Sequence, residues 1–180
     1  PKFNDQFDGS VELAYQMGET GVNDMDGMML DAIGNWHIPS EGDMRPCLSL
    51  GWYYLSGDDP NTADDEGWNP LWSRWPQYSE LYIYAFDADG AGRWSNVNMP
   101  HIDFTISPMG KNWKSKLMAA YLMAPEKDGP GGGGDRGLLG TWRNDFLLRE
   151  KMLGQKDKLL GHLLFEVLEP GNYYNVDKTA

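Results

Sequence analysis

The chain has 180 residues, a formal net charge of −12 and a single cysteine, Cys47. The acidic balance excludes nucleic acid and anionic lipid as the main partners, because both attract basic patches. One cysteine excludes an internal disulfide and leaves no second cysteine for a zinc site. No apolar run approaches the roughly eighteen residues of a membrane-spanning helix, which excludes a helical membrane protein and leaves membrane-spanning strands open.

Apolar and polar residues alternate with period two along most of the chain, which is typical of β-strands. In residues 101–107, for example, Ile102, Phe104 and Ile106 share one face and polar residues share the other. Residues 80–86 could form a further strand, and we assign them to a loop instead. We therefore predict seven strands, near residues 11–17, 28–38, 46–55, 100–107, 114–123, 139–150 and 158–168.

The connections between these strands alternate between short and long. The short ones are 39–43, 109–112 and 153–156, and the long polar ones are 19–27, 57–98 and 125–137. Transmembrane β-barrels have tight periplasmic turns and long outer loops. The pattern predicts an all-β fold, a transmembrane antiparallel β-barrel, in which 57–98 is a long outer loop.

Seven strands are an odd number, whereas bacterial single-chain barrels have an even number. We therefore expect residues 1–180 to be the C-terminal part of a single outer-membrane β-barrel domain, with at least one closing strand missing.

Three stretches carry a family resemblance. They are residues 51–59 (GWYYLSGDD), residues 68–76 (WNPLWSRWP) and residues 94–96 (WSN). They resemble the alginate-export family of bacterial outer-membrane β-barrel proteins. In that family a strand ends in Tyr-x-x-Ser-Gly-Asp, and a long loop follows with an aromatic-Asp-Pro-Leu-aromatic-Pro element and then Trp-x-Asn. Residues 7–16 and 161–173 also look like its later strands and final outer loop.

The resemblance covers most of the chain and corresponds to about the last third of a family member. It implies a closed barrel of about 16–18 strands in the bacterial outer membrane. It also implies contact with membrane lipid and lipopolysaccharide, possible periplasmic or outer-surface protein partners, and passage or export of small polar solutes or an anionic polysaccharide. Two departures are Trp68-Asn69, where the family tends to have Phe-Asp, and the acidic balance, since the founding alginate channel has an arginine-rich lumen.

Charged residues on the polar face of the strands are candidates to line a pore. They are Asp31, Asp103, Lys116, Arg143, Asp145, Arg149, His162 and Glu166. They could form a charged constriction that selects permeant ions or sugars. With about equal weight, opposite charges could pair across neighbouring strands and only stiffen the wall.

The tryptophans form two groups. One group lies on or beside strands, as in interfacial aromatic girdles: Trp36, Trp52, Trp113 and Trp142. The other lies in the long loop: Trp68, Trp72, Trp75 and Trp94. The second group could stack on sugar rings at a pore mouth. We favour the alternative, a loop that buries its own aromatic side chains.

No cofactor is predicted, although acidic loops could hold Ca²⁺. The clusters are Asp24/Asp26, residues 58–66 and Asp87/Asp89. Residues 87–90 begin like a calcium loop, but Ala91 takes the fifth position and Asn98 replaces the final glutamate, so we favour solvated surface charge.

The three histidines lie in different strands, without the spacing of metal ligands, and no catalytic motif is present. We predict a channel, not an enzyme. Two alternatives are a soluble β-sandwich carbohydrate-binding module, and a β-rich lyase or hydrolase that would need a catalytic group not found.

Overall fold

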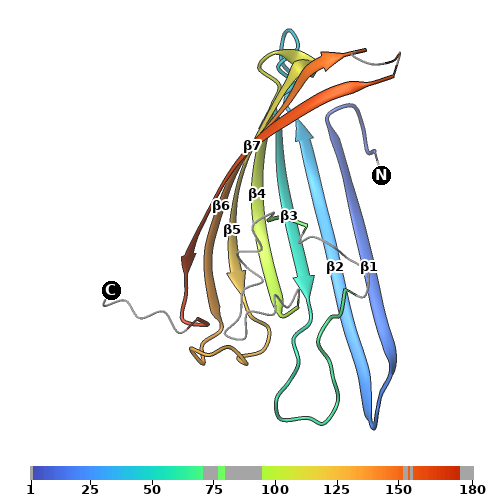
Figure 1. The fold of residues 1–180 in the computed structure, drawn as a ribbon, viewed down its shortest axis with the longest axis vertical. Helices are drawn as coiled ribbons and strands as arrows, with labels where there is room; N and C mark the ends of the chain where they lie inside the picture. Colours follow the sequence, from blue (N-terminus) through green and yellow to red (C-terminus); the bar gives the residue numbers. More distant parts are fainter. Residues whose placement is uncertain (1, 71–76, 80–94, 152–153, 155, 175–180) are drawn as a thin grey trace.

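A computed structural model describes residues 2–70, 77–79, 95–151, 154 and 156–174, which form an all-β, seven-stranded antiparallel sheet (Figure 1). The strands pair in sequence order, so each lies beside its neighbours along the chain. They are β1 (Phe7–Thr20), β2 (Asn23–His37), β3 (Cys47–Leu55), β4 (Val97–Ile106), β5 (Trp113–Met123), β6 (Asp135–Glu150) and β7 (Lys158–Pro170). A three-residue helix, η2 (Gly110–Asn112), precedes β5, and no helix among the described residues is long and apolar enough to cross a membrane.

All seven predicted strands are confirmed, and most are longer than predicted. The predicted long loop at 19–27 is wrong. β1 and β2 pair as far as Thr20 and Asn23, and only Gly21 and Val22 connect them. Gly21 adopts a φ of 71°, which suits a tight hairpin turn. The acidic residues of this segment belong to the ladder and not to a loop.

The connections gather at two ends of the sheet (Figure 1). The β2–β3 and β4–β5 connections lie at the upper end in this view, and the β1–β2 turn and the β5–β6 connection lie at the lower end. The two sets are on opposite ends because every strand pair is antiparallel and consecutive. Residues 80–86, the alternative eighth strand, lie outside the described residues.

One face of the sheet is apolar on every strand. A single row of directly paired residues crosses all seven strands: Phe7, Trp36, Leu48, Phe104, Leu117, Trp142 and Phe165. Phe7 stacks on Trp36, with ring centroids 6.4 Å apart, and Trp142 stacks on Phe165 at 5.5 Å. We call this side the apolar face, and the opposite side the polar face.

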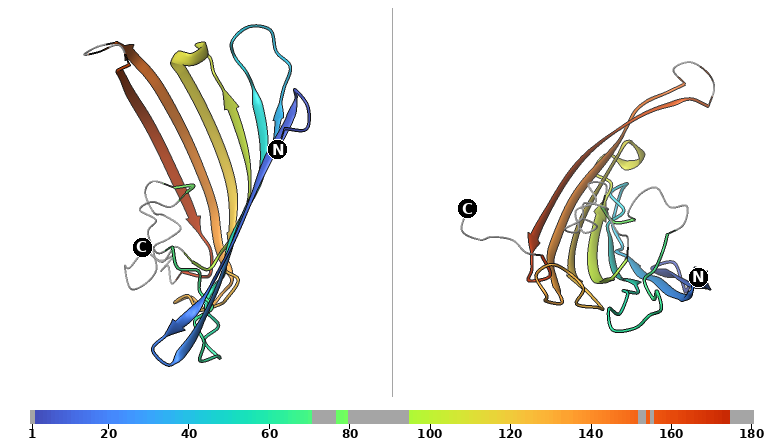
Figure 2. Two further views of the ribbon diagram at one scale, coloured as in Figure 1. Left: turned by 90° about the vertical axis from the view of Figure 1, so that its right-hand side faces the viewer. Right: turned by 60° about the horizontal axis from the view of Figure 1, so that its bottom comes forward.

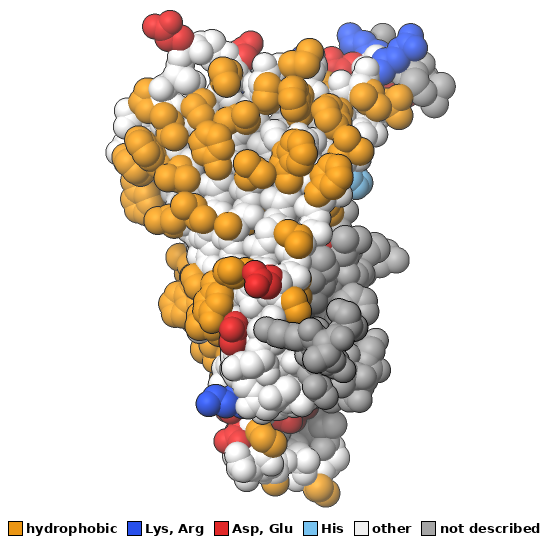
Figure 3. Space-filling model, turned by 90° about the vertical axis from the view of Figure 1, so that its left-hand side faces the viewer, with side chains coloured by type: hydrophobic (Ala, Val, Ile, Leu, Met, Phe, Trp, Pro, Cys, Tyr) orange, Lys and Arg blue, Asp and Glu red, His pale blue; other side chains and the backbone are white. Residues whose placement is uncertain are grey.

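The apolar face is exposed, which inverts the arrangement of an ordinary globular sheet. Most large apolar side chains on it are exposed, and several are more than half exposed, including Leu13 at 68 %, Leu50 at 64 % and Val167 at 67 %. Figure 3 shows apolar side chains spread over the upper part of the molecule's surface. The buried core instead lies on the other side, between the polar face and the segment that follows β3.

The sheet curls along its width (Figure 2). The core fills the lower, long-loop part of its polar side and consists of Tyr53, Leu55, Val97, Met99, Met118, Ala120, Leu122 and Leu139. Trp68 and Tyr78 from the β3–β4 connection pack against this core. Trp68 and Tyr78 therefore lie on the polar side of the sheet, and no other described segment of the chain packs on the apolar face.

Candidate functional site

The polar face carries a second continuous row across the seven strands: Asp8, Asn35, Ser49, Asp103, Met118, Thr141 and Glu166. Six of these seven residues are polar. The row runs directly behind the apolar face, because successive side chains of a strand point to opposite sides. Sheet alternation thus places a hydrophilic band on one side and a hydrophobic band on the other.

Seven of the eight predicted pore-lining residues share this polar face. Directly paired residues, and residues two apart on one strand, point to the same side of a sheet. By this rule the seven are Asp31, Asp103, Lys116, Arg143, Asp145, His162 and Glu166. Arg149 lies apart from them. A bulge between Leu147 and Arg149 shifts the register, so Arg149 pairs with Leu159 and not with a polar-face residue.

Opposite charges on this face pair across and along strands. Lys116 Nζ lies 3.1 Å from Asp103 Oδ2, and Arg143 Nε donates to Asp145 Oδ1 at 2.9 Å. The Asp103 side chain is only 2 % exposed. The alternative of cross-strand charge pairing is therefore present for Lys116, whereas Arg143 pairs along its own strand.

His101 is buried beside Asp103, and sequence reasoning did not select it as a site residue. Its Nδ1 lies 3.4 Å from Asp103 Oδ2, and its side chain is completely buried. The ring lies over Gly51, where an added Cβ would come within 3 Å of its atoms. Gly51 in the middle of β3 is the one signal that could have indicated such a close approach.

Residues 77–79 fasten the β3–β4 connection to both sides of the polar face. Tyr78 donates its hydroxyl to Asp31 at 2.8 Å, and Ser79 donates to Glu166 at 2.9 Å. Asp31 lies on β2 and Glu166 on β7, five strand spacings apart, or about 24 Å in a flat sheet. The curl of the sheet brings both strands within reach of neighbouring residues (Figure 2).

Tyr78 is the centre of this contact. Its ring lies 4.6 Å from the ring of His101 and 5.2 Å from that of Tyr53. Lys116 Nζ is 6.0 Å from the ring centroid. Burial, and secondly the hydrogen bond to Asp31, raise the pKa of Tyr78 far above its ordinary value, so the hydroxyl remains a donor.

A cavity of about 810 Å³ lies between residues 77–79 and the sheet. Charged and hydroxyl side chains line much of it, with a few apolar ones: Ser10, Asp31, Ile33, Gln77, Tyr78, Ser79, Lys116, Met118, Thr141, Arg143, Leu164 and Glu166. Four of the predicted pore-lining residues, Asp31, Lys116, Arg143 and Glu166, meet here. The site is a space lined by charged, hydroxyl and apolar side chains and narrowed by residues 77–79 of the long loop.

Of the four predicted loop tryptophans, only Trp68 lies within the described residues; Trp72, Trp75 and Trp94 lie outside them. Trp68 packs against the core, and its backbone N–H donates to the Ser56 carbonyl at 3.1 Å. For Trp68 the structure therefore favours a loop that buries its own aromatic side chain.

The acidic residues of the loop are partly tied to one another. The backbone N–H of Asp59 donates to Glu66 at 3.0 Å, and that of Glu66 donates to Asp58 at 3.1 Å. In the part of the chain that the structure describes, no three His, Cys, Asp or Glu side chains gather as a metal site would require. Asp87 and Asp89 lie outside that part.

Arg136 joins the segments at the long-loop end and was not anticipated from the sequence. Its guanidinium lies 4.8 Å from the Tyr173 ring and 5.7 Å from the Tyr174 ring. It also donates to the carbonyl of Asn96 at 2.8 Å, and Asn96 in turn donates to Asp128 at 2.6 Å. This network fixes the start of β4, the β5–β6 connection and the end of β7 to one another.

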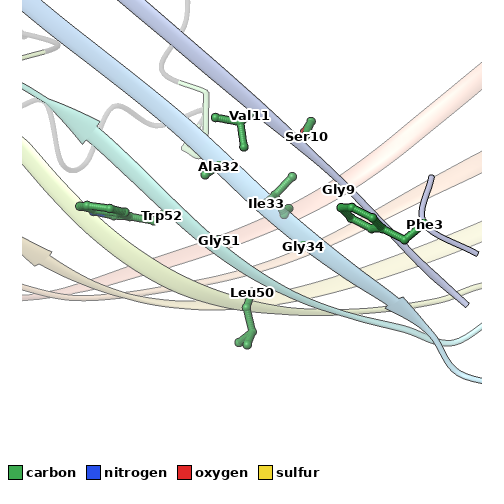
Figure 4. Close-up of a pocket in the computed structure, with 10 residues that line it drawn as sticks. All are labelled: Phe3, Gly9, Ser10, Val11, Ala32, Ile33, Gly34, Leu50, Gly51 and Trp52. Carbon is green, nitrogen blue, oxygen red and sulfur yellow. The ribbon is translucent and has the colours of Figure 1, made fainter. Parts of the chain in front are cut away.

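The apolar face carries a recess of about 450 Å³ near β1 and β2 (Figure 4). Gly9 and Gly34 pair directly there, and side chains that include Phe3, Val11 and Trp52 also line the recess. An added Cβ at Gly34 would meet no atom within 4 Å. The recess is therefore open space on an otherwise side-chain-covered face.

Comparison with protein-family models, with curated proteins and with solved structures found no match to this chain.

Proposed function

We propose that this chain forms part of the wall of a bacterial outer-membrane β-barrel channel. The single observation that carries the proposal is the inverted sheet. Exposed apolar residues stand on all seven strands of one face, and a row of mainly polar residues crosses the opposite face. Lipid on one side and a water-filled lumen on the other would satisfy both rows.

The height of the apolar face fits a bilayer. On β1 the apolar alternation runs from Phe7 to Met17, ten residue steps or about 33 Å along the strand. At a tilt of about 40°, usual for barrel strands, this covers about 25 Å across a membrane, the height of the apolar band of such barrels.

Exposure on this scale is costly in water. Burying one large apolar side chain is worth about 1.5–3 kcal/mol, and contiguous exposed patches mark membrane or protein contacts. In the alternative, a soluble sandwich, a second sheet would pack on this face. Within the described residues no segment covers it, and the β3–β4 connection packs on the polar face. The observation favours the membrane over the sandwich.

The polar face supports a passive channel with a constriction. Residues 77–79 cross the polar face and are bound to Asp31 and Glu166, leaving the cavity of about 810 Å³ beside them. Such an inner loop would narrow the lumen for small polar solutes or a polysaccharide. The sequence resemblance to alginate-export barrels suggests the same class of function.

The test is to extract the intact protein that contains this chain with detergent and to reconstitute it in planar bilayers. We expect the protein to require detergent for solubility and to produce stepwise ion conductance. Free solubility without detergent together with no conductance would overturn the channel and favour the soluble carbohydrate-binding module.

A further inference from the structure

We infer that the polar face selects cations over anions and that the paired carboxylates of Glu12 and Asp31 are a principal determinant of this selectivity. The inference rests on the proposed channel function and names the class of ion or solute that the channel prefers. A cation-selective lumen differs from the arginine-rich lumen of the founding alginate channel, which suits an anionic polymer.

The polar face is acidic over the region between the long-loop end and the bulge at Leu147/Arg149. By pairing and alternation it carries six carboxylates against three basic side chains, histidines aside. The carboxylates are Asp8, Glu12, Asp31, Asp103, Asp145 and Glu166. The basic residues are Lys114, Lys116 and Arg143. The net charge of this region is therefore −3.

The basic side chains are matched to particular carboxylates. Lys116 lies 3.1 Å from Asp103, and Arg143 lies 2.9 Å from Asp145. Lys114 stands directly opposite Asp145 in the ladder. Lys114 and Arg143 share Asp145, so these matches cancel two of the three positive charges, and four carboxylates then outweigh one remaining positive charge.

Glu12 and Asp31 are directly opposite each other on β1 and β2. Directly opposed like charges have Cβ atoms about 5 Å apart and destabilise a sheet. Asp31 accepts hydrogen bonds from Gln77 and Tyr78, which are both uncharged. No basic side chain of the described residues forms an ion pair with either carboxylate.

The position of Glu12 and Asp31 suggests a function for this unfavourable pairing of like charges. Asp31 lines the cavity beside residues 77–79, where the constriction would lie, and Glu12 is exposed on the adjacent strand. A ring or pair of carboxylates at a narrow point raises the local population of cations and lowers that of anions.

The experiment is the reversal potential of the intact protein that contains this chain, measured in planar bilayers across a KCl gradient. Wild type should be more permeable to K⁺ than to Cl⁻. In the isosteric neutral variant E12Q/D31N, the K⁺/Cl⁻ permeability ratio should fall about two- to fivefold at low ionic strength. The fall should be smaller at high salt, because salt screens the carboxylates.

The matched control is E19Q/D24N. Glu19 and Asp24 are also a directly opposed carboxylate pair on β1 and β2. By strand alternation, however, their side chains lie on the same side of the sheet as the apolar face. The control should leave the permeability ratio unchanged. Anion preference in wild type, an unchanged ratio in E12Q/D31N, or an equal loss in the control would overturn the inference while leaving the channel intact. Absence of any conductance would overturn the channel, and this inference with it.

Discussion

The indole N–H of Trp113 donates a 3.0 Å hydrogen bond to Oδ1 of Asn144, a polar residue of the apolar face that is only 3 % exposed. Asn144 pairs directly with Ser115, which accepts from the indole of Trp142, also at 3.0 Å. On β4, Asn98 accepts from Trp52 at 2.8 Å. Each polar residue thus satisfies an indole N–H that would otherwise be unpaired in an apolar medium.

Asn144→Leu should therefore destabilise the protein although it makes the apolar face more apolar. The substitution leaves the Trp113 N–H without its acceptor, which costs about 1–3 kcal/mol when the group is shielded from water. The free energy of unfolding in urea, measured in detergent micelles, checks this. The double variant W113F/N144L removes both partners and should recover most of the loss; no recovery would mean that the hydrogen bond is not the cause.

Gly51→Ala should be much more disruptive than Gly34→Ala. A Cβ at position 51 would overlap the His101 ring, whereas one at position 34 meets nothing within 4 Å. Overpacking of this kind costs about 1–3 kcal/mol, so Gly51→Ala should lower the unfolding midpoint and Gly34→Ala should not. Adding His101→Ala to Gly51→Ala should restore stability. Equal midpoints for the two single variants would contradict the close approach.

Tyr78→Ala should widen the proposed constriction and raise single-channel conductance. The change removes the ring that lies between Asp31 and His101 and the hydrogen bond that fastens residues 77–79. Tyr78→Phe keeps the ring and loses only the hydrogen bond. Its mean conductance should therefore rise less than that of Tyr78→Ala, and its conductance should fluctuate more than that of wild type. Tyr54→Ala, from the apolar-face alternation, serves as the control. A conductance unchanged by Tyr78→Ala would place the constriction elsewhere.

High pH should weaken the network at the long-loop end. Burial, and secondly the hydrogen bond to Asp128, raise the pKa of Tyr173 to about 12. Because the folded pKa exceeds the ordinary value near 10, the folded state holds its proton longer than the unfolded state. The stabilisation is complete below about pH 10 and is lost between about pH 10 and 12. The difference in tyrosinate absorbance and in melting temperature between wild type and Tyr173→Phe, followed across this range, measures it. A Tyr173 that titrates near pH 10 would contradict its burial.

Period-two alternation was enough to predict the seven strands, because each strand separates an apolar from a polar environment. It failed where charge was taken as a sign of a loop. Glu19 and Asp24 are paired in the ladder of an extended hairpin, beyond its apolar part. Arg149 was assigned to the polar face because alternation carries no marker of the bulge that shifts its register.

The contacts of residues 77–79 could not be predicted for a different reason. Which loop residue meets Asp31 and Glu166 depends on the curl of the sheet and not on local sequence. Arg136 is similar, since it contacts residues 95–96 and 173–174, two segments that meet only in the folded chain. Seven of the eight charged candidates could be assigned to one face because strand periodicity alone determines the side.

The sequential pairing of the strands has a consequence for how the protein is made. Most of the sheet consists of hairpins between chain neighbours, so its pieces can form early and independently. The β3–β4 pair must wait for the long connection to close, and the Ser79–Glu166 contact must wait for the last strand. Each partly formed sheet would present an unpaired edge and a bare apolar face, which favours aggregation. We expect the unassembled chain to depend on a chaperone until its apolar face is covered.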